Sequence, residues 1–233
     1  MKAFLMAAGT GTRLRPITDT IPKCLVPIRG VPLLDIWLEA LAKAGIEEVL
    51  LNLHYLPSQV EDHLRTRSAP VRVVTSFEPE LLGSAGTLRA NQDWVGDDER
   101  FLVCYADNLT DFEVGKLISF HREQGAMASL ALFRAPDPLA CGIVELDDTG
   151  RVTGFAEKPQ QPLSDLANAG IYMFESAVLG EIPGSAPKDI GFDLLPRLVG
   201  RAWGLPIEGY FRDIGTIEAY QHAQLEWNPG EAR

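Results

Sequence analysis

A glycine-rich segment near the start of the 233-residue chain carries the residue types that bind phosphate groups. It reads Ala7-Ala8-Gly9-Thr10-Gly11-Thr12-Arg13-Leu14-Arg15-Pro16, and Pro22-Lys23 follow it. Gly9 and Gly11 permit positive φ and close backbone approach, and successive amide groups in such a turn bind phosphate oxygens. Arg13 spreads positive charge over several oxygens, whereas Lys23 supplies a point charge. The segment therefore predicts a polyphosphate site, with a solvated basic loop as the alternative.

Two better-known glycine motifs do not fit this segment. The dinucleotide fingerprint G-x-G-x-x-G fails because Leu14 stands at the third glycine position. The P-loop fails because no Gly-Lys-Ser/Thr follows. A hydride-transferring dinucleotide enzyme is therefore only a distant alternative.

Two aspartates follow expected strands or turns further along the chain. Asp107 comes directly after the apolar run 101–105, and Asp213 lies in Phe211-Arg212-Asp213-Ile214-Gly215-Thr216. Two carboxylates, together with phosphate oxygens and waters, suit Mg²⁺, or Mn²⁺ in its place. Read separately, Asp107 is typical of a turn and Asp213 of a cap for a helix that begins near Thr216.

Further polar residues lie at the ends of expected strands and helices. Glu78 precedes the run Leu82-Gly83-Ser84-Ala85-Gly86-Thr87, which reads as a loop entering a helix. Glu157-Lys158-Pro159 reads as a strand end with a surface ion pair. Asn168-Ala169-Gly170 and Cys141-Gly142 complete the set. None of these runs identifies a site by itself.

The run G-T-G-T-R-L-R-P-I-T, with P-K-x-L-x-P downstream, resembles the sugar-phosphate nucleotidyltransferases, also called nucleotide-sugar pyrophosphorylases. Their short members that act as mannose- or heptose-1-phosphate guanylyltransferases are the most similar. The resemblance extends to about Trp227. It implies a Rossmann-like, GT-A-like α/β fold. Larger members continue into a left-handed β-helix, but only about 17 residues follow Thr216 here, so we expect residues 1–233 to form one domain without a C-terminal β-helix. The resemblance also implies transfer of a nucleotidyl group from an NTP to a sugar 1-phosphate, with release of pyrophosphate.

The same resemblance implies a role for each motif. Arg13 and Lys23 are the expected catalytic residues, and Asp107 and Asp213 are the expected ligands of Mg²⁺. The expected nucleotide contacts are Ala8, Gly9, Thr10, Gly11, Thr12, Glu78, Gly83 and Ser84. The expected sugar-phosphate contacts are Gly142, Glu157, Lys158 and Asn168.

The identity of the base depends on Glu78. In the family, the residue five before the first glycine of the L-G-S-A-G run often contacts the base edge, and relatives that use UTP or dTTP often carry Gln there. A carboxylate only accepts hydrogen bonds, and guanine offers two adjacent donors where uracil or thymine offers one. This favours GTP with a mannose- or heptose-type 1-phosphate. The alternative is a uridylyl- or thymidylyltransferase acting on a glucose- or amino-sugar-type 1-phosphate.

A non-catalytic relative that binds nucleotide sugars and regulates a partner is the other class of function to weigh. Such a relative is expected to lose Arg13, Lys23 or one of the aspartates, and this chain retains them all. The sequence therefore favours an enzyme, and it leaves the oligomeric state open, with a homodimer as one candidate.

Composition and charge indicate which classes of molecule the chain is expected to bind. The chain is 46% hydrophobic with a net charge of −11, which excludes a disordered protein and argues against binding to nucleic acid or anionic membranes. The charge is uneven, because the first 30 residues hold five Lys or Arg and one Asp. The odd set Cys24, Cys104 and Cys141 suits a reducing compartment, so we expect a cytoplasmic protein.

The elements that must position these residues follow from the apolar pattern. Strands alternate with helices up to residue 133, which is typical of a parallel sheet whose ligands bind beyond the strand ends, after Ala7, Thr75 and Tyr105. Later strands, joined by the turn 147–150, indicate a mixed antiparallel extension. The expected strands are 2–7, 48–53, 71–75, 101–105, 127–133, 142–146, 151–157 and 169–174, and the expected helices are 33–44, 57–66, 84–94, 112–124, 192–199 and 216–227.

Overall fold

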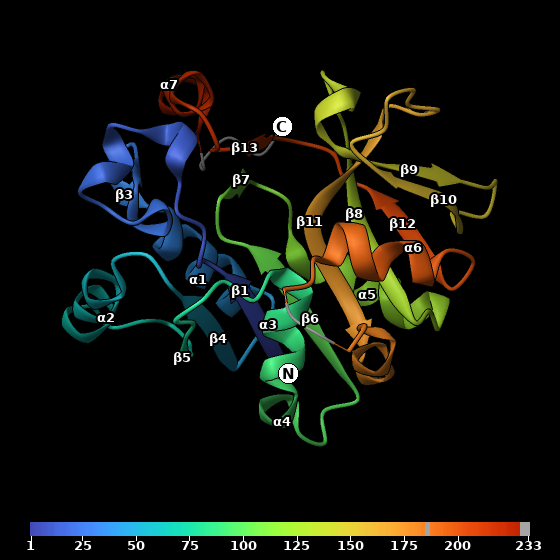
Figure 1. The fold of residues 1–233 in the computed structure, drawn as a ribbon, viewed down its shortest axis with the longest axis horizontal. Coiled ribbons are helices and arrows are strands. Elements are labelled where there is room, and N and C mark those ends of the chain that lie inside the picture. Colours follow the sequence, from blue (N-terminus) through green and yellow to red (C-terminus); the bar gives the residue numbers. More distant parts are fainter. Residues whose placement is uncertain (185–186, 229–233) are drawn as a thin grey trace.

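The computed structural model describes residues 1–184 and 187–228, and a single large sheet runs through it. Four strands at one side are parallel to one another, as the alternation of strands and helices predicted. They lie in the order β6, β1, β4, β5 (Figure 1). Their bounds are β1 Lys2–Met6, β4 Glu48–Leu53, β5 Arg72–Phe77 and β6 Arg100–Tyr105.

The other side of the sheet is the mixed extension expected from the second half of the sequence. Here β11 runs antiparallel to β6, β8 and β9, and β10 runs antiparallel to β9. The turn 147–150 forms as predicted, because the Asp147 carboxylate accepts hydrogen bonds from the amides of Thr149 and Arg151 and Gly150 has φ +85°. The bounds are β8 Ala128–Arg134, β9 Gly142–Leu146, β10 Val152–Glu157 and β11 Leu166–Glu175.

One strand on this side of the sheet was not predicted from the sequence. The strand β12 (Ala202–Pro206) pairs parallel with β8 at the edge of the sheet. Its sequence holds Gly204 and ends in Pro206, residues that are depleted in strands, so its local pattern resembles a loop. The Arg201 carbonyl instead accepts a hydrogen bond from the Met127 amide just before β8 begins, and this contact aligns the two segments.

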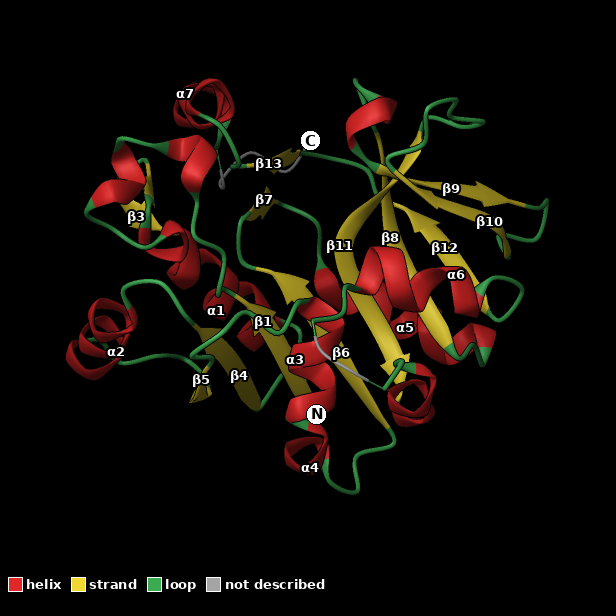
Figure 2. Ribbon diagram, in the orientation of Figure 1, coloured by secondary structure: helices red, strands yellow, loops and turns green. Residues whose placement is uncertain are grey.

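Helices cover both faces of the sheet (Figure 2). One apolar cluster joins the sheet to α1, α2 and α5, and a second joins the opposite face to α3, α4 and α6. The short helices and strands outside the large sheet pack around a third cluster, which includes Leu14. The helix bounds are α1 Leu33–Lys43, α2 Pro57–Thr66, α3 Ser84–Ala90, α4 Gln92–Val95, α5 Val114–Gln124, α6 Leu195–Leu198 and α7 Ile217–Glu226.

Two predicted helices differ from the structure. The helix expected over 84–94 is broken at Asn91, whose side-chain amide donates to the Thr87 carbonyl at 2.9 Å and so competes with the helical bonding pattern. The helix expected over 192–199 begins earlier, with a π-helical turn at Ile190–Leu194, and continues as α6. Asp189 starts this turn, because its carboxylate accepts hydrogen bonds from the amides of Gly191 and Phe192.

Two small sheets were also not predicted from the sequence, and one of them positions residues of the expected site. The strands β2 (Pro27–Ile28) and β3 (Val31–Pro32) form a short hairpin. The strands β7 (Asn108–Thr110) and β13 (Phe211–Asp213) pair antiparallel, with Asp213 opposite Asn108. Because these strands are only three residues long, no apolar alternation marks them in the sequence. Their pairing brings the 107 and 213 regions together.

Candidate active site

The glycine-rich loop follows β1 and presents unpaired backbone amides. Gly11 has φ +64°, and a Cβ there would lie 2.9 Å from the Thr18 methyl group, so only glycine fits. Within the described parts of the chain, the amide groups of Gly9, Thr10, Gly11 and Thr12 donate no backbone hydrogen bond. Leu14 is fully buried and anchors the far end of the loop. A row of free N–H groups on a fixed loop is suited to phosphate oxygens.

Thr18, which was not among the predicted site residues, fixes the shape of this loop. Thr18 is fully buried, and its hydroxyl donates to the Gly11 carbonyl at 2.7 Å. The Tyr55 hydroxyl, from the loop after β4, donates to the Thr18 carbonyl at 3.0 Å. Neither residue was singled out from the sequence, although Thr18 ends the run G-T-G-T-R-L-R-P-I-T.

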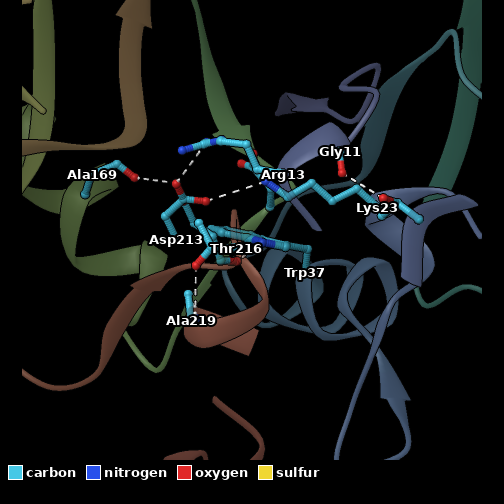
Figure 3. A network of polar contacts seen from close by, with 11 residues as sticks. Gly11, Arg13, Lys23, Trp37, Ala169, Asp213, Thr216 and Ala219 are labelled. Atoms are coloured by element: carbon cyan, nitrogen blue, oxygen red, sulfur yellow. Dashed lines mark hydrogen bonds and ion pairs between the residues drawn. The ribbon is translucent and has the colours of Figure 1, made fainter. Parts of the chain in front are cut away.

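Two cations and two carboxylates meet beside the loop (Figure 3). The Lys23 ammonium lies 2.7 Å from Asp107 Oδ2 and 3.6 Å from Asp213 Oδ1. The Arg13 guanidinium lies 3.8 Å from Asp213 Oδ2. The Lys23 side chain is 9% exposed, whereas the other three are 38% exposed or more. The Lys23 amine is therefore buried, while the charged groups that surround it are more exposed.

The β7–β13 pair explains why these residues meet. Asp107 immediately precedes β7 and Asp213 ends β13, and the Ile214 amide donates to the Asp107 carbonyl at 2.9 Å. Partial burial raises the pKa of Asp213, the neighbouring charge of Asp107 raises it further, and Lys23 and Arg13 oppose the rise. Gly215 leaves room for Arg13, since a Cβ there would lie 2.9 Å from the guanidinium.

The residues at this cluster fit a magnesium ion. Mg²⁺ in phosphate-transfer sites takes one or two carboxylates and completes its shell with waters and substrate phosphates. Asp107 and Asp213 offer two carboxylates, and the nearby loop offers free amides suited to phosphate oxygens. Among the described residues, no cluster of three or more His, Cys, Asp or Glu side chains provides a metal site made by protein alone. The donor set thus suits a metal that binds together with a phosphate substrate.

Glu157 ends β10 and lies next to two glycines, and Lys158 directly follows it. The Glu157 carboxylate is so close to Gly142 and Gly191 that a Cβ at either glycine would come within 2.5 Å of Oε2. Burial raises the pKa of Glu157, Asp189 raises it further, and Lys158 opposes the rise. Lys158 has φ +49°, and its amide donates to the Cys141 carbonyl at 3.0 Å. Lys158 is exposed.

Asn168 is positioned by an irregularity in β11. The register of β11 against β8 shifts between Asn168 and Tyr172, where Gly170 has φ +68°. The Asn168 amide donates to the Tyr172 hydroxyl at 2.6 Å, and its oxygen accepts from the Gly170 amide. The bulge therefore fixes the orientation of the Asn168 side chain.

Cys141 lies next to the 157–158 strand end, because its carbonyl accepts a hydrogen bond from the Lys158 amide. Burial raises the pKa of its thiol, the charges of Asp137, Glu157 and Asp213 raise it further, and Lys158 opposes the rise. All of these charges are therefore close enough to act on one half-buried thiol. The charges that act on this thiol include one expected metal ligand, Asp213, and two expected sugar-phosphate residues, Glu157 and Lys158.

The loop expected to contact the base is held by a segment that the sequence reading missed. Gly83 has φ +75° and lies against the Lys188 carbonyl, which also accepts from the amides of Ala85 and Gly86. The Ser84 hydroxyl donates to Asp189 Oδ2 at 2.9 Å. Asp189 thus holds a residue of the predicted site in place. The sequence offers only one local signal for it, since aspartate is common at turns.

Glu78 lies in an environment different from the one expected of a base-contacting group. The residue is 2% exposed. Its Oε1 accepts from the Asn52 amide and the Thr87 hydroxyl, and its Oε2 accepts from the Leu82 amide. Both carboxylate oxygens are therefore hydrogen-bonded within the protein. The interpretation from the sequence required Glu78 to face the base, and the structure does not place it so.

Comparisons with known proteins agree on one family. The family model described as "Nucleotidyl transferase" matches residues 2–228. The chain is 36% identical to the UTP–glucose-1-phosphate uridylyltransferase of Synechocystis sp., a match covering 96% of this chain and 62% of that protein. It is 34% identical to the mannose-1-phosphate guanylyltransferase catalytic subunit beta of Danio rerio, covering 92% of this chain and 61% of that protein. The chain therefore spans somewhat less than two thirds of the length of these relatives.

A solved structure shares the fold over almost the whole chain. The HddC protein of Yersinia pseudotuberculosis superposes with a TM-score of 0.82 at 25% identity, over 97% of this chain and 98% of that one. In the described part of the chain, every helix falls short of the length and apolar character that crossing a membrane requires.

Proposed function

The chain belongs to the nucleotidyl transferase family, and on this premise we propose that it transfers a nucleotidyl group from an NTP to a sugar 1-phosphate and releases pyrophosphate. One observation carries the proposal: Arg13, Lys23, Asp107 and Asp213 meet beside a loop with free backbone amides. Such a site combines phosphate binding, charge neutralisation and two metal-binding carboxylates.

The reaction needs positioning more than proton transfer. A phosphate oxygen of the sugar 1-phosphate attacks the α-phosphorus of the NTP, and the bond from that phosphorus to the pyrophosphate oxygen breaks, with its electron pair leaving on pyrophosphate. The attacking phosphate is already ionised at neutral pH, so no general base is required. Catalysis then depends on alignment of the two anions and on neutralisation of their charge.

Each charged residue has a role in this scheme. Arg13, which is largely exposed, contacts phosphate oxygens as negative charge develops. Lys23 binds a phosphate oxygen near the point of attack, and its contacts with both aspartates fix where its ammonium lies. Lys158 orients the sugar phosphate, and Glu157 accepts hydrogen bonds from sugar hydroxyls. A Mg²⁺ ion held by Asp107 and Asp213 would supply additional positive charge at the phosphates.

Replacement of Lys158 by alanine is expected to raise the KM for the sugar 1-phosphate by about tenfold or more, because a charge-assisted hydrogen bond contributes roughly 1.5–3 kcal/mol. The KM for the NTP is expected to change little, since Lys158 directly follows β10 and is not among the residues proposed to bind the NTP. Steady-state kinetics with each substrate varied in turn measures both values. Lys116→Ala, which removes an exposed cation paired with Glu113, is the matched control. A rise confined to the NTP would contradict the assignment.

We propose GTP as the preferred NTP and a mannose- or heptose-type 1-phosphate as the partner. Support comes from relatives that act as mannose-1-phosphate guanylyltransferases in animals and plants, at 32–34% identity. A uridylyl- or thymidylyltransferase acting on a glucose- or amino-sugar-type 1-phosphate is the second candidate, favoured by the 36% identical cyanobacterial relative.

A panel of four NTPs against several sugar 1-phosphates, read by pyrophosphate release, tests both levels of the proposal. GTP is expected to exceed UTP in kcat/KM by about ten- to a hundredfold, the usual range for discrimination by one or two polar contacts. A preference for UTP or dTTP would overturn the base and leave the reaction class intact. Turnover of no pair would favour a non-catalytic, regulatory nucleotide-sugar-binding protein.

Two further expectations belong with this proposal. A cytoplasmic location agrees with three cysteines that are free in the structure, two of them buried. A homodimer is a candidate assembly, and light scattering of the purified chain measures its mass directly.

A further inference from the structure

A buried polar network lies beneath the two loops expected to bind the NTP. It consists of Asn52 on β4, Glu78 in the segment after β5, and Thr87 on α3. These three side chains are 4%, 2% and 1% exposed. Polar groups buried this deeply are unfavourable unless they are fully hydrogen-bonded, so a network of this kind is sensitive to the loss of any one member.

The Asn52 side chain joins the start of the glycine-rich loop to this network. Its Oδ1 accepts from the Ala7 amide at 2.7 Å, directly after β1 ends. Its Nδ2 donates to Glu78 Oε1 at 2.9 Å and contacts Thr87 Oγ1 at 3.2 Å. Asn52 thus adds a hydrogen bond at Ala7, the residue that follows β1, and connects this residue to Glu78 and Thr87.

The Glu78 residue is fixed through every one of its polar groups. Its amide donates to the Leu53 carbonyl at 2.8 Å, and its carbonyl lies 2.8 Å from the His54 ring nitrogen Nδ1. Its carboxylate binds the Thr87 hydroxyl at 2.5 Å and the Leu82 amide at 3.1 Å. The carboxylate therefore shapes the turn that leads to Gly83.

The Thr87 hydroxyl connects the same turn to α3. Besides its contact with Glu78, the hydroxyl lies 3.1 Å from the Gly83 carbonyl. Gly83 and Ser84 are residues expected to contact the nucleotide, and Ala8 and Gly9 of the other loop directly follow Ala7. The network is thus the direct hydrogen-bonded connection between the phosphate side and the base side of the expected NTP site.

We propose that Asn52, Glu78 and Thr87 are positioning residues that hold these two loops at the separation an NTP requires, without touching the base themselves. The inference rests on the proposed function, since it concerns the same nucleotide. It assigns Glu78 a role independent of base identity, in contrast to the interpretation drawn from its residue type. Loss of the network is expected to weaken every NTP by a similar factor.

The matched pair Thr87→Val and Thr87→Ser tests the role of the hydroxyl. Valine preserves the shape and removes the hydroxyl, whereas serine retains it. Thr87→Val is expected to raise the KM for GTP by about tenfold, since it removes a hydrogen bond to the buried Glu78 carboxylate, while the KM for the sugar 1-phosphate stays within about twofold. Thr87→Ser is expected to restore most of the affinity for GTP. Equal KM values for GTP in wild type and Thr87→Val would overturn the proposal.

Glu78→Gln separates positioning from base recognition. Glutamine places an NH₂ group among the three donors that face the carboxylate, so affinity for GTP and for UTP is expected to fall by the same factor, within about twofold. A change in the GTP/UTP ratio of kcat/KM by about tenfold or more, the size expected for a lost base contact, would overturn the proposal and show that Glu78 contacts the base.

A control variant distinguishes positioning from general destabilisation. Ser129→Ala removes a hydrogen bond to the buried His121, near the end of β11 farthest from Asn168. This variant is expected to lower Tm and leave the KM for GTP unchanged. If Ser129→Ala raises the KM as much as Thr87→Val does at an equal loss of Tm, the proposal fails.

Calorimetric titration of GTP without the sugar substrate keeps the two levels of inference apart. A wild-type protein that binds none of GTP, UTP and dTTP, each titrated in the same way, would contradict the proposed function. A wild type that binds GTP together with a Thr87→Val variant that binds equally tightly would contradict the positioning role alone. Weaker binding by Thr87→Val and by Glu78→Gln, with recovery in Thr87→Ser, is the expected result.

Discussion

Replacement of both Asp107 and Asp213 by asparagine is expected to abolish nucleotidyl transfer while the protein remains folded. Asparagine preserves the size of each side chain and removes the negative charge that a divalent cation requires. The two carboxylates come from different parts of the chain and meet only because β7 and β13 pair. They lie close enough for the charge of Asp107 to raise the pKa of Asp213, an arrangement that a bound cation would stabilise.

The measurement is pyrophosphate release with and without added Mg²⁺ or Mn²⁺, together with circular dichroism to confirm folding. Wild-type activity is expected to disappear in excess EDTA and to return when either metal is restored. Asp148→Asn, in the exposed 147–150 turn, removes a charge outside the cluster and is expected to behave as wild type. Full activity of the double variant, or of the wild type in EDTA, would refute the metal role of these aspartates.

Lys23→Ala and Arg13→Ala are each expected to lower kcat by about a hundredfold or more, the loss usually seen when one donor aimed at a developing anion is removed. The Lys23 ammonium is held by both aspartates, so it is pre-oriented before substrate arrives. Arg13 is more exposed and contacts Asp213 alone of the two. We therefore expect Lys23→Ala to lower kcat and Arg13→Ala to lower kcat and also raise the KM for the NTP.

Arg15 provides the matched control for this loop. It stands two residues from Arg13, is about equally exposed, and pairs with Asp19 at 3.1 Å rather than with the cluster. Arg15→Ala is expected to retain kcat within about twofold, as is usual for an exposed surface pair. Turnover near the wild-type level in both Lys23→Ala and Arg13→Ala would show that this loop does not bind the reacting phosphates.

The elements whose signals are local could be predicted from the amino-acid sequence. The helix at 57–66 and the strands at 48–53 and 142–146 have the predicted bounds, because apolar periodicity and turn residues act over a few neighbouring positions. The mixed extension after residue 133 follows from the same kind of signal. The choice of Arg13, Lys23, Asp107 and Asp213 as one set came from the resemblance of their motifs to a family, and the structure brings all four together.

The direction in which individual side chains face could not be predicted from the sequence, because it depends on the folded chain. Glu78 has the residue type expected to accept hydrogen bonds from guanine, yet its donors are Asn52, Thr87 and the Leu82 amide. Lys23 meets Asp107, which lies 84 residues further along the chain. Residue type fixes what a group can bind, but the partner is chosen by strand order and by the need to satisfy every buried polar group, and both depend on contacts distant in sequence.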